Sequence, residues 1–287
     1  MPSIYYVKKP SGFSQETDEL LITPFAFQPT PKGVKTLCAY YSAKYSINLQ
    51  SIDFRERIPL PNYTNPLQLF RYLAENPSLI EVAEGQSRGI ILNHGDNHAI
   101  PLLITKQGGK AVIICFDSTS GASIKGYYKM AEALHHYDFF LNEGTRQADS
   151  TSCITDSICI LKEALQIDRL LNLIDSKVYL EHPTLKTTRF FNKLPPSNFR
   201  LFKMPEQLLV TAQLPSYVKE ADTSVMLRGG KTLKDYRSQF CITISVFKGT
   251  DTNLKNINSY LYMKSATHRT IFDKLEMKNN EITMPGI

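Results

Sequence analysis

Two short apolar runs separated by a polar segment dominate the middle of the chain. The first covers residues 98–104, the second covers residues 111–116, and the segment between them carries a Gly-Gly pair. This pattern is typical of a β-hairpin whose strands are largely buried. Pro101 in the first run cannot donate a hydrogen bond to a neighbouring strand, so we expect it at a sheet edge or a bulge.

Helical spacing follows this hairpin. Ile154, Ile158, Leu161 and Leu165 recur at intervals of three to four residues, which predicts a helix from residue 153 that continues to residue 174. A cluster of Ser and Thr at 150–152 offers N-cap residues for this helix. Weaker patterns predict helices over 34–41, 65–75, 127–136 and 206–212, strands over 87–92, 139–141 and 239–247, and a partly helical tail from residue 255.

Composition narrows the function classes. The chain has 287 residues, 42% of them apolar, and a net charge of +6 that is spread without a basic tract, so we expect no nucleic-acid partner. No apolar run approaches the length of a membrane span, and the N-terminal residues lack the apolar core of a secretory signal. The five cysteines are odd in number and lack zinc-site spacing, which predicts reduced thiols and a cytoplasmic protein.

Candidate chemistry lies at one end of the predicted hairpin. His98 opens the first strand and Asp117 follows the second. Antiparallel strands place the start of one beside the end of the other, so we expect these two side chains close together. An aspartate there can accept from one ring N–H of the imidazole and leave the other nitrogen to act as a base.

Cys153 is the candidate nucleophile. It opens the predicted helix, where the helix dipole and a nearby imidazole favour the thiolate, whereas Asp156 in the same turn opposes it. Gln147, six residues earlier, can donate a side-chain N–H to an oxyanion. A histidine, an aspartate, a glutamine and a cysteine together are the components of a cysteine-nucleophile enzyme.

The order His98, Asp117, Gln147, Cys153 resembles the clan CE cysteine proteases. That group includes the SUMO- and ubiquitin-like-specific proteases, their bacterial effector relatives and the Yop-type acetyltransferases. The nineteen-residue step from His98 to Asp117 and the six-residue step from Gln147 to Cys153 both fit the family. The resemblance covers residues 86–165. It implies a papain-like α+β fold, in which a central mixed β-sheet is flanked by helices and the nucleophile lies at a helix N-terminus.

The resemblance also implies a function. We expect a thiol isopeptidase that removes ubiquitin or a ubiquitin-like modifier, acting without a metal or cofactor as a monomeric bacterial effector in a host cytosol. A Yop-type acetyltransferase with the same residues is the alternative, and it needs basic side chains around an inositol phosphate. A non-catalytic ubiquitin-binding module is a third class. We expect an N-terminal extension over 1–60, a catalytic core over 61–180 and a C-terminal substrate-recognition region over 181–287.

Several positions depart from this pattern or compete with it. Ser152, Ile154 and Ala99 stand where the family has aspartate, glycine and, in SUMO proteases, tryptophan. Cys38 with the same histidine and aspartate would follow the papain or transglutaminase order, and His94 is a rival base.

Residues 227–230 are a further feature to explain. They spell Leu-Arg-Gly-Gly, as in the C-terminal tail of ubiquitin. Such a segment is either a solvent loop with a Gly-Gly turn or a mimic of a bound product. We expect the solvent loop.

Overall fold

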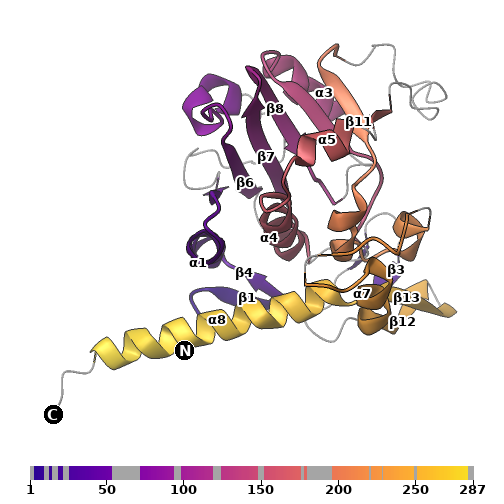
Figure 1. Ribbon diagram of the computed structural model, residues 1–287. Coiled ribbons are helices and arrows are strands. Elements are labelled where there is room, and N and C mark those ends of the chain that lie inside the picture. Colours follow the sequence, from indigo (N-terminus) through magenta and orange to yellow (C-terminus); the bar gives the residue numbers. More distant parts are fainter. Residues whose placement is uncertain are drawn as a thin grey trace.

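The predicted hairpin forms the middle of a seven-stranded sheet. In the computed structural model, β7 (Ala99–Gln107) and β8 (Lys110–Cys115) pair antiparallel. Residues 99–105 of β7 are all buried, because both faces of the sheet are covered. The strand order is β10-β11-β9-β8-β7-β6-β5 (Figure 1). The remaining strands are β5 (Leu49–Asp53), β6 (Ser87–Asn93), β9 (Asp138–Asn142), β10 (Val178–Tyr179) and β11 (Phe199–Phe202).

The sheet is mixed, as the α+β prediction requires. Strand β7 is antiparallel to both of its neighbours, β6 and β8, whereas β5 joins β6 in parallel, and β9 joins both β8 and β11 in parallel. The expected fold class is therefore confirmed. The structure describes residues 3–9, 13–14, 19–21, 26–53, 72–93, 98–118, 124–147, 152–175, 178–179, 196–219, 221–227, 229–248 and 251–283.

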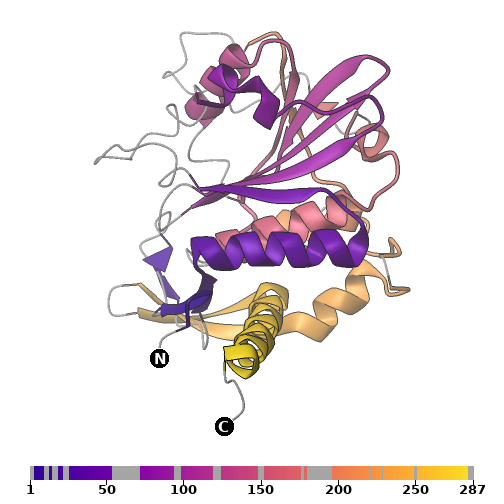
Figure 2. The same ribbon diagram turned by 90° about the vertical axis from the view of Figure 1, so that its left-hand side faces the viewer.

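Helices cover both faces of the sheet. On one face, α1 (Pro31–Tyr45) and α4 (Cys153–Ala164) lie side by side, and their buried side chains join one core cluster with strand residues such as Ile91 and Leu103 (Figure 2). On the other face, α3 (Ile124–Ala133) packs Tyr127 and Met130 against a second cluster. Helix α4 is buried along almost its whole length, which fixes the position of its first residue.

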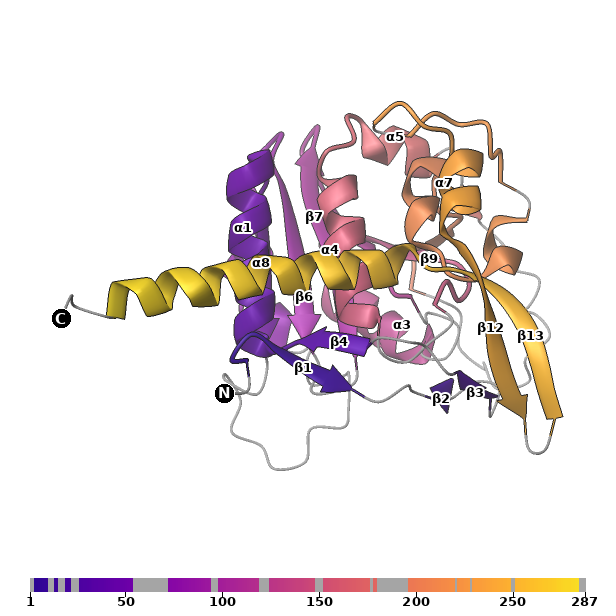
Figure 3. The same cartoon turned by 90° about the horizontal axis from the view of Figure 1, so that it is seen from below.

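The two ends of the chain pack together beyond α1 and α4. The long helix α8 (Tyr260–Thr283) runs across both helices (Figure 3), and Phe272 stacks on Tyr5 with ring centroids 5.4 Å apart. Near it are two small sheets, one of β1 (Tyr6–Lys9) and β4 (Ala26–Pro29), the other of β2 (Phe13–Ser14), β3 (Glu19–Leu21), β12 (Cys241–Lys248) and β13 (Asp251–Asn258).

Short elements connect these layers. They are η2 (Pro77–Leu79), α5 (Leu170–Asp175), η4 (Glu206–Thr211), η5 (Pro215–Val218) and α7 (Leu233–Phe240). The described part of the chain contains no helix long and apolar enough to cross a membrane. The expected boundaries at 60 and 180 stay predictions, although the large sheet takes β5 and β11 from outside them.

Several local predictions were wrong. Pro101 lies in the interior strand β7, not at an edge of the sheet. It directly precedes Leu102, the first residue of β7 that pairs with β8. The helix over 153–174 is two helices, because Arg169 adopts a left-handed φ of 54° between α4 and α5. The helix over 206–212 is the 3-10 turn η4. The predicted N-cap cluster at 150–152 is confirmed, since Ser152 is the N-cap of α4, although its side chain makes no capping bond. Of the helix over 65–75, residues 65–71 lie outside the described part.

Candidate active site

The hairpin brings His98 and Asp117 together, as its antiparallel geometry predicts. His98 directly precedes β7, Asp117 follows β8 by two residues, and His98 Nε2 lies 3.1 Å from Asp117 Oδ1. The carboxylate is 1% exposed and the imidazole 28% exposed, so the pair forms an anchored base with one open side. Since Nε2 faces Asp117, Nδ1 is the ring nitrogen left for the nucleophile.

Cys153 lies beside this imidazole. It is the first residue of α4, and its side chain is hydrogen-bonded with His98. Burial disfavours the imidazolium, but the charge of Asp117 and hydrogen bonds with Asp117 and Cys153 outweigh it, and the pKa of His98 rises well above 6.5. A protonated imidazole beside a thiol at a helix N-terminus is the environment that activates a cysteine.

Gln147 completes the set from the loop after β9. Ser118, the residue after Asp117, donates from its hydroxyl to Gln147 Oε1 at 2.6 Å. The amide oxygen is thereby engaged, so Nε2 is the part of Gln147 that would donate to an oxyanion. The backbone N–H of Cys153 at the start of α4 would be a second donor to such an oxyanion.

Tyr127 of α3 supports the aspartate from behind. Its buried hydroxyl donates to Asp117 Oδ2, while Oδ1 faces His98. The two carboxylate oxygens therefore hold separate partners on opposite sides. Nothing in the sequence around Tyr127 indicates this role, because the residue fits an ordinary apolar helix face.

Replacing Tyr127 with phenylalanine is expected to reduce kcat/KM for thiol-dependent turnover about tenfold, corresponding to about 1.4 kcal/mol for one buried hydrogen bond to a charged group. The ring stays, so the packing against Phe139 is kept. Steady-state kinetics of this variant beside Tyr128→Phe, on the same helix, make the measurement. Equal losses in both variants would contradict the role.

The rival nucleophile Cys38 does not join this site. Cys38 lies in the middle of α1 within the core, where burial, opposed by a hydrogen bond with Ser51, raises the pKa of its thiol to about 12. Burial likewise raises the pKa of Cys159 on α4 to about 12. His94 lies outside the described residues. The described part of the chain contains no group of three or more potential metal ligands.

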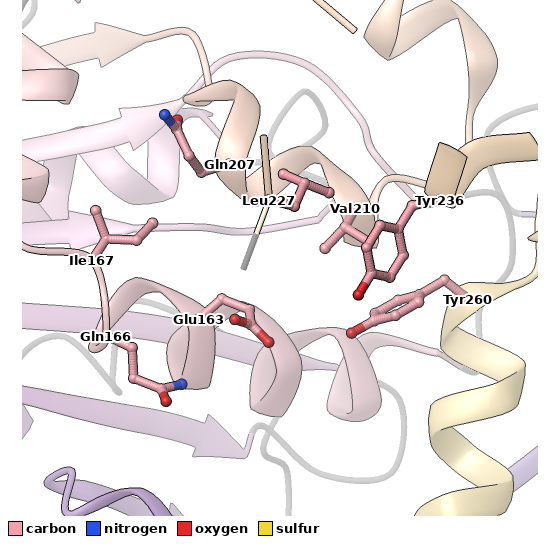
Figure 4. A pocket seen from close by; sticks show the side chains of 8 residues that line it. All are labelled: Glu163, Gln166, Ile167, Gln207, Val210, Leu227, Tyr236 and Tyr260. Atoms are coloured by element: carbon pink, nitrogen blue, oxygen red, sulfur yellow. The ribbon is translucent and has the colours of Figure 1, made fainter. Parts of the chain in front are cut away.

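Leu227, Gly229 and Gly230 lie away from the candidate site, and Arg228 between them lies outside the described residues. Gly229 and Gly230 form a turn with positive φ angles, which confirms the Gly-Gly turn, and Leu227 lines a cavity of about 280 Å³. Figure 4 shows that the carboxylate of Glu163 and the hydroxyls of Tyr236 and Tyr260 point into this cavity. Glu163 is ten residues from Cys153 along α4, which is about 15 Å of helix. A product-mimic role for this segment therefore has no support from its position.

Comparison with known proteins gives a fold but no sequence family. No family model matches the chain, and no curated protein matches it. Among solved structures, AvrA with IP6 and CoA aligns with a TM-score of 0.53 and 16% identity, covering 83% of this chain and 85% of that one. HopZ1a with IP6 and CoA aligns with a TM-score of 0.58 and 10% identity, covering 83% and 82%. HopZ1a with IP6 alone gives 0.52 and 11% over the same shares. The chain thus has the fold of AvrA and HopZ1a.

Proposed function

We propose that this chain is a cysteine acyltransferase, which takes an acetyl group from acetyl-CoA onto Cys153 and passes it to a hydroxyl or amine of an acceptor protein. The observation that carries the proposal is the His98–Asp117–Cys153 arrangement in a chain with the fold of AvrA and HopZ1a. Those two are bacterial effectors of the YopJ family, which are acetyltransferases. We therefore expect an effector that acts in the cytosol of a host cell.

The residues divide the chemistry between them. His98, held by Asp117, takes the proton of Cys153, and the thiolate attacks the thioester carbonyl. Gln147 Nε2 and the Cys153 N–H donate to the oxyanion. The CoA thiolate leaves and takes the proton from His98. In the second half, the acceptor attacks the acyl-cysteine, His98 takes the acceptor's proton, and Cys153 leaves as a thiolate.

The structures of AvrA and HopZ1a hold IP6, and the interface of α4 with α8 in this chain offers a basic cluster, Lys162, Lys264 and His268, for such a group. Lys162 Nζ lies 5.9 Å from the ring centroid of Tyr41, and the His268 ring lies 5.7 Å from the same ring. His268 is 1% exposed, and within the described residues neither ring nitrogen has a hydrogen-bond partner. Lys162 also pairs with the carboxylate of Glu163. A phosphate would supply the missing partners of His268 and would face the charge of Lys264, so these three residues are the ones that would hold it.

Acid destabilisation is expected from His268 in the absence of a polyanion. Burial and the charges of Lys264 and Lys162 lower its pKa from 6.5 to about 3. Below the unfolded value the unfolded chain binds a proton that the folded chain does not, so stability is lost as the pH falls toward the folded value. At about pH 5, the free energy of unfolding is expected to be about 2 kcal/mol lower than at neutral pH. Urea unfolding should show this loss in the wild type and not in His268→Leu.

The control for this experiment is His136→Leu, which removes an exposed histidine and should keep the wild-type pH dependence. Added IP6 should reduce the acid loss in the wild type, because an anion beside His268 favours its protonated form. An identical pH dependence in wild type and His268→Leu would contradict the buried neutral state of this histidine.

The isopeptidase hypothesis uses the same residues and the same acyl-enzyme chemistry. It differs in the donor, which would be the C-terminus of ubiquitin or a ubiquitin-like protein. The comparisons favour acetyl transfer over it, since the AvrA and HopZ1a structures hold CoA and IP6. We therefore place it second to acetyl transfer.

Intact mass spectrometry after incubation with acetyl-CoA tests the proposal. We expect one acetyl group mapped to Cys153, formed faster when IP6 is present and absent from Cys153→Ala. A parallel incubation uses ubiquitin, SUMO and NEDD-type tails that carry a C-terminal electrophile. An adduct of such a tail at Cys153, with no acetylation from acetyl-CoA, would overturn the proposal in favour of the isopeptidase.

A further inference from the structure

Arg146 is a buried guanidinium next to the candidate site that the chemistry above leaves unexplained. It directly precedes Gln147 and is 1% exposed. Its Nη1 and Nη2 donate to the two carboxylate oxygens of Asp156 at 2.8 and 2.7 Å. Nη1 also donates to Thr211 Oγ1 at 2.9 Å, and Nη2 donates to the carbonyl oxygen of Phe116 at 2.6 Å.

These partners come from the segments that carry the candidate residues. Phe116 precedes Asp117, Asp156 lies in the first turn of α4 three residues after Cys153, and Arg146 itself precedes Gln147. The main chain ties the same segments together, because the N–H of Arg146 donates to the carbonyl oxygen of Ser118 at 2.9 Å. One side chain thus connects the strand end, the loop and the helix start.

The C-terminal part of the chain is tied to the same point. The carbonyl oxygen of Arg146 accepts from the N–H groups of Gln213 and Leu214 at 2.9 and 3.2 Å, and Thr211 lies at the end of η4. A displacement of η4 would therefore act on the guanidinium directly. This connection could not have been expected from the sequence, since 65 residues separate Arg146 from Thr211.

Charge gives Arg146 a second effect. A carboxylate in the first turn of α4 opposes a thiolate at the first residue, and Asp156 is 1% exposed, so water does not screen it. Burial disfavours the guanidinium as well, but the attraction of Asp156 outweighs it and holds the pKa of Arg146 above its usual value. Burial raises the pKa of Asp156, whereas the charge and hydrogen bonds of Arg146 act to lower it. Because the guanidinium binds both carboxylate oxygens at 2.8 and 2.7 Å, its positive charge offsets the charge that Asp156 places beside the nucleophile.

We propose that Arg146 is a positioning residue for the reaction at Cys153, which holds Asp117, Gln147 and the start of α4 in one arrangement through its fork of hydrogen bonds. A buried ion pair stabilises a fold no better than apolar side chains of the same volume. A planar guanidinium does fix directions, because each N–H points along a set line in one plane. The inference rests on the proposed thiol chemistry, for whichever acyl group is transferred.

Three variants separate positioning from stability. Arg146→Met leaves Asp156 buried without its partner and should lower the melting temperature. Arg146→Met combined with Asp156→Leu removes both charges and should restore much of that temperature. Arg146→Lys keeps a cation without the fork. Lys110→Met breaks the exposed pair with Asp138, whose atoms lie 2.8 Å apart, and is the control expected to match the wild type.

The main readout is the rate of alkylation of Cys153 by iodoacetamide, mapped by mass spectrometry, which needs no acyl donor. We expect the double variant to fold and to alkylate at least about tenfold more slowly than the wild type, with Arg146→Lys in between. Where acetyl transfer is measurable, kcat should fall while KM changes less than about threefold.

A double variant with wild-type alkylation, kcat and KM would overturn the inference and leave Arg146 a stabilising residue only. If the double variant does not fold, Arg146→Lys decides the matter by the same comparison with the wild type. Absence of acetyl transfer in the wild type would count against the proposed function alone, because the alkylation rates would still measure the role of Arg146.

Discussion

Replacing Cys153 with alanine is expected to abolish thioester formation and acyl transfer, whereas replacing Cys38 with alanine should leave both unchanged. The expected loss is complete, since the thiol of Cys153 is the one that the structure shows hydrogen-bonded with His98, the candidate base. Cys38 is buried within α1, where burial keeps its thiol protonated, with a pKa of about 12. The two cysteines therefore differ in environment far more than in local sequence.

Intact mass and peptide mapping make this measurement, with both variants incubated with acetyl-CoA and with ubiquitin-like electrophiles. Cys159→Ala serves as a second control, because Cys159 lies on the same helix in the core. Circular dichroism confirms that each variant is folded. Loss of the adduct in Cys38→Ala, with retention in Cys153→Ala, would establish the papain order of residues instead.

The hairpin and the nucleophile helix could be predicted because their patterns are local. Apolar residues spaced two to four positions apart indicate the buried strands and the apolar helix face. Antiparallel pairing of the two strands then places His98 beside Asp117. The position of Cys153 followed in the same way from the first apolar residue of its helix. The predicted N-cap cluster is confirmed as well, since Ser152 is the N-cap of α4.

The supporting residues could not be predicted because no local spacing indicates their contacts. Tyr127 donates to Asp117 from a helix that begins after the strand end, and Arg146 donates to Thr211, which lies 65 residues further along the chain. Each reads locally as an ordinary helix or loop residue. The packing of Phe272 on Tyr5 is likewise a contact between the two ends of the chain. Contacts of this kind produce no periodic pattern in a single sequence, so they cannot be predicted from it.

The break after α4 has a similar cause. Apolar residues continue at helical spacing from Ile158 through Leu170 to Ile174, so the pattern predicts one helix. The structure instead places Arg169 in a left-handed conformation, which turns the chain before α5. Arginine has no local preference for this conformation. The turn is stabilised because it allows Leu170 and Ile174 to be buried in the core.

Replacing Asp117 with asparagine is expected to reduce kcat about 10²–10³-fold and to move the alkaline limb of the pH–rate profile to lower pH. The carboxylate does two things for His98: it fixes the ring through Nε2 at 3.1 Å, and its charge holds the imidazolium. Asparagine keeps the volume but not the charge. Burial, which by itself lowers the pKa of His98, is then opposed only by what remains of the contact with Cys153.

The direction of the pH effect follows from the raised pKa. The reactive pair needs a protonated His98 beside a thiolate, so activity falls as the pH rises through the pKa of His98. The same shift contributes folding stability that is fully present below 6.5 and is lost as the pH rises through the raised value. In Asp117→Asn, the pH at which activity falls and the pH at which this stability is lost should both be lower than in the wild type.

The rate of Cys153 acetylation by acetyl-CoA across a pH series makes this measurement, because this step uses the protonated His98 to give a proton to the leaving CoA thiolate. Asp138→Asn is the matched control, since it breaks an exposed pair with Lys110 far from the thiol chemistry and should leave the alkaline limb in place. If the alkaline limb of Asp117→Asn lies at the same pH as in the wild type, Asp117 is not what keeps His98 protonated. The 3.1 Å contact would then orient the imidazole without controlling its protonation, and the rate loss would come from misorientation alone.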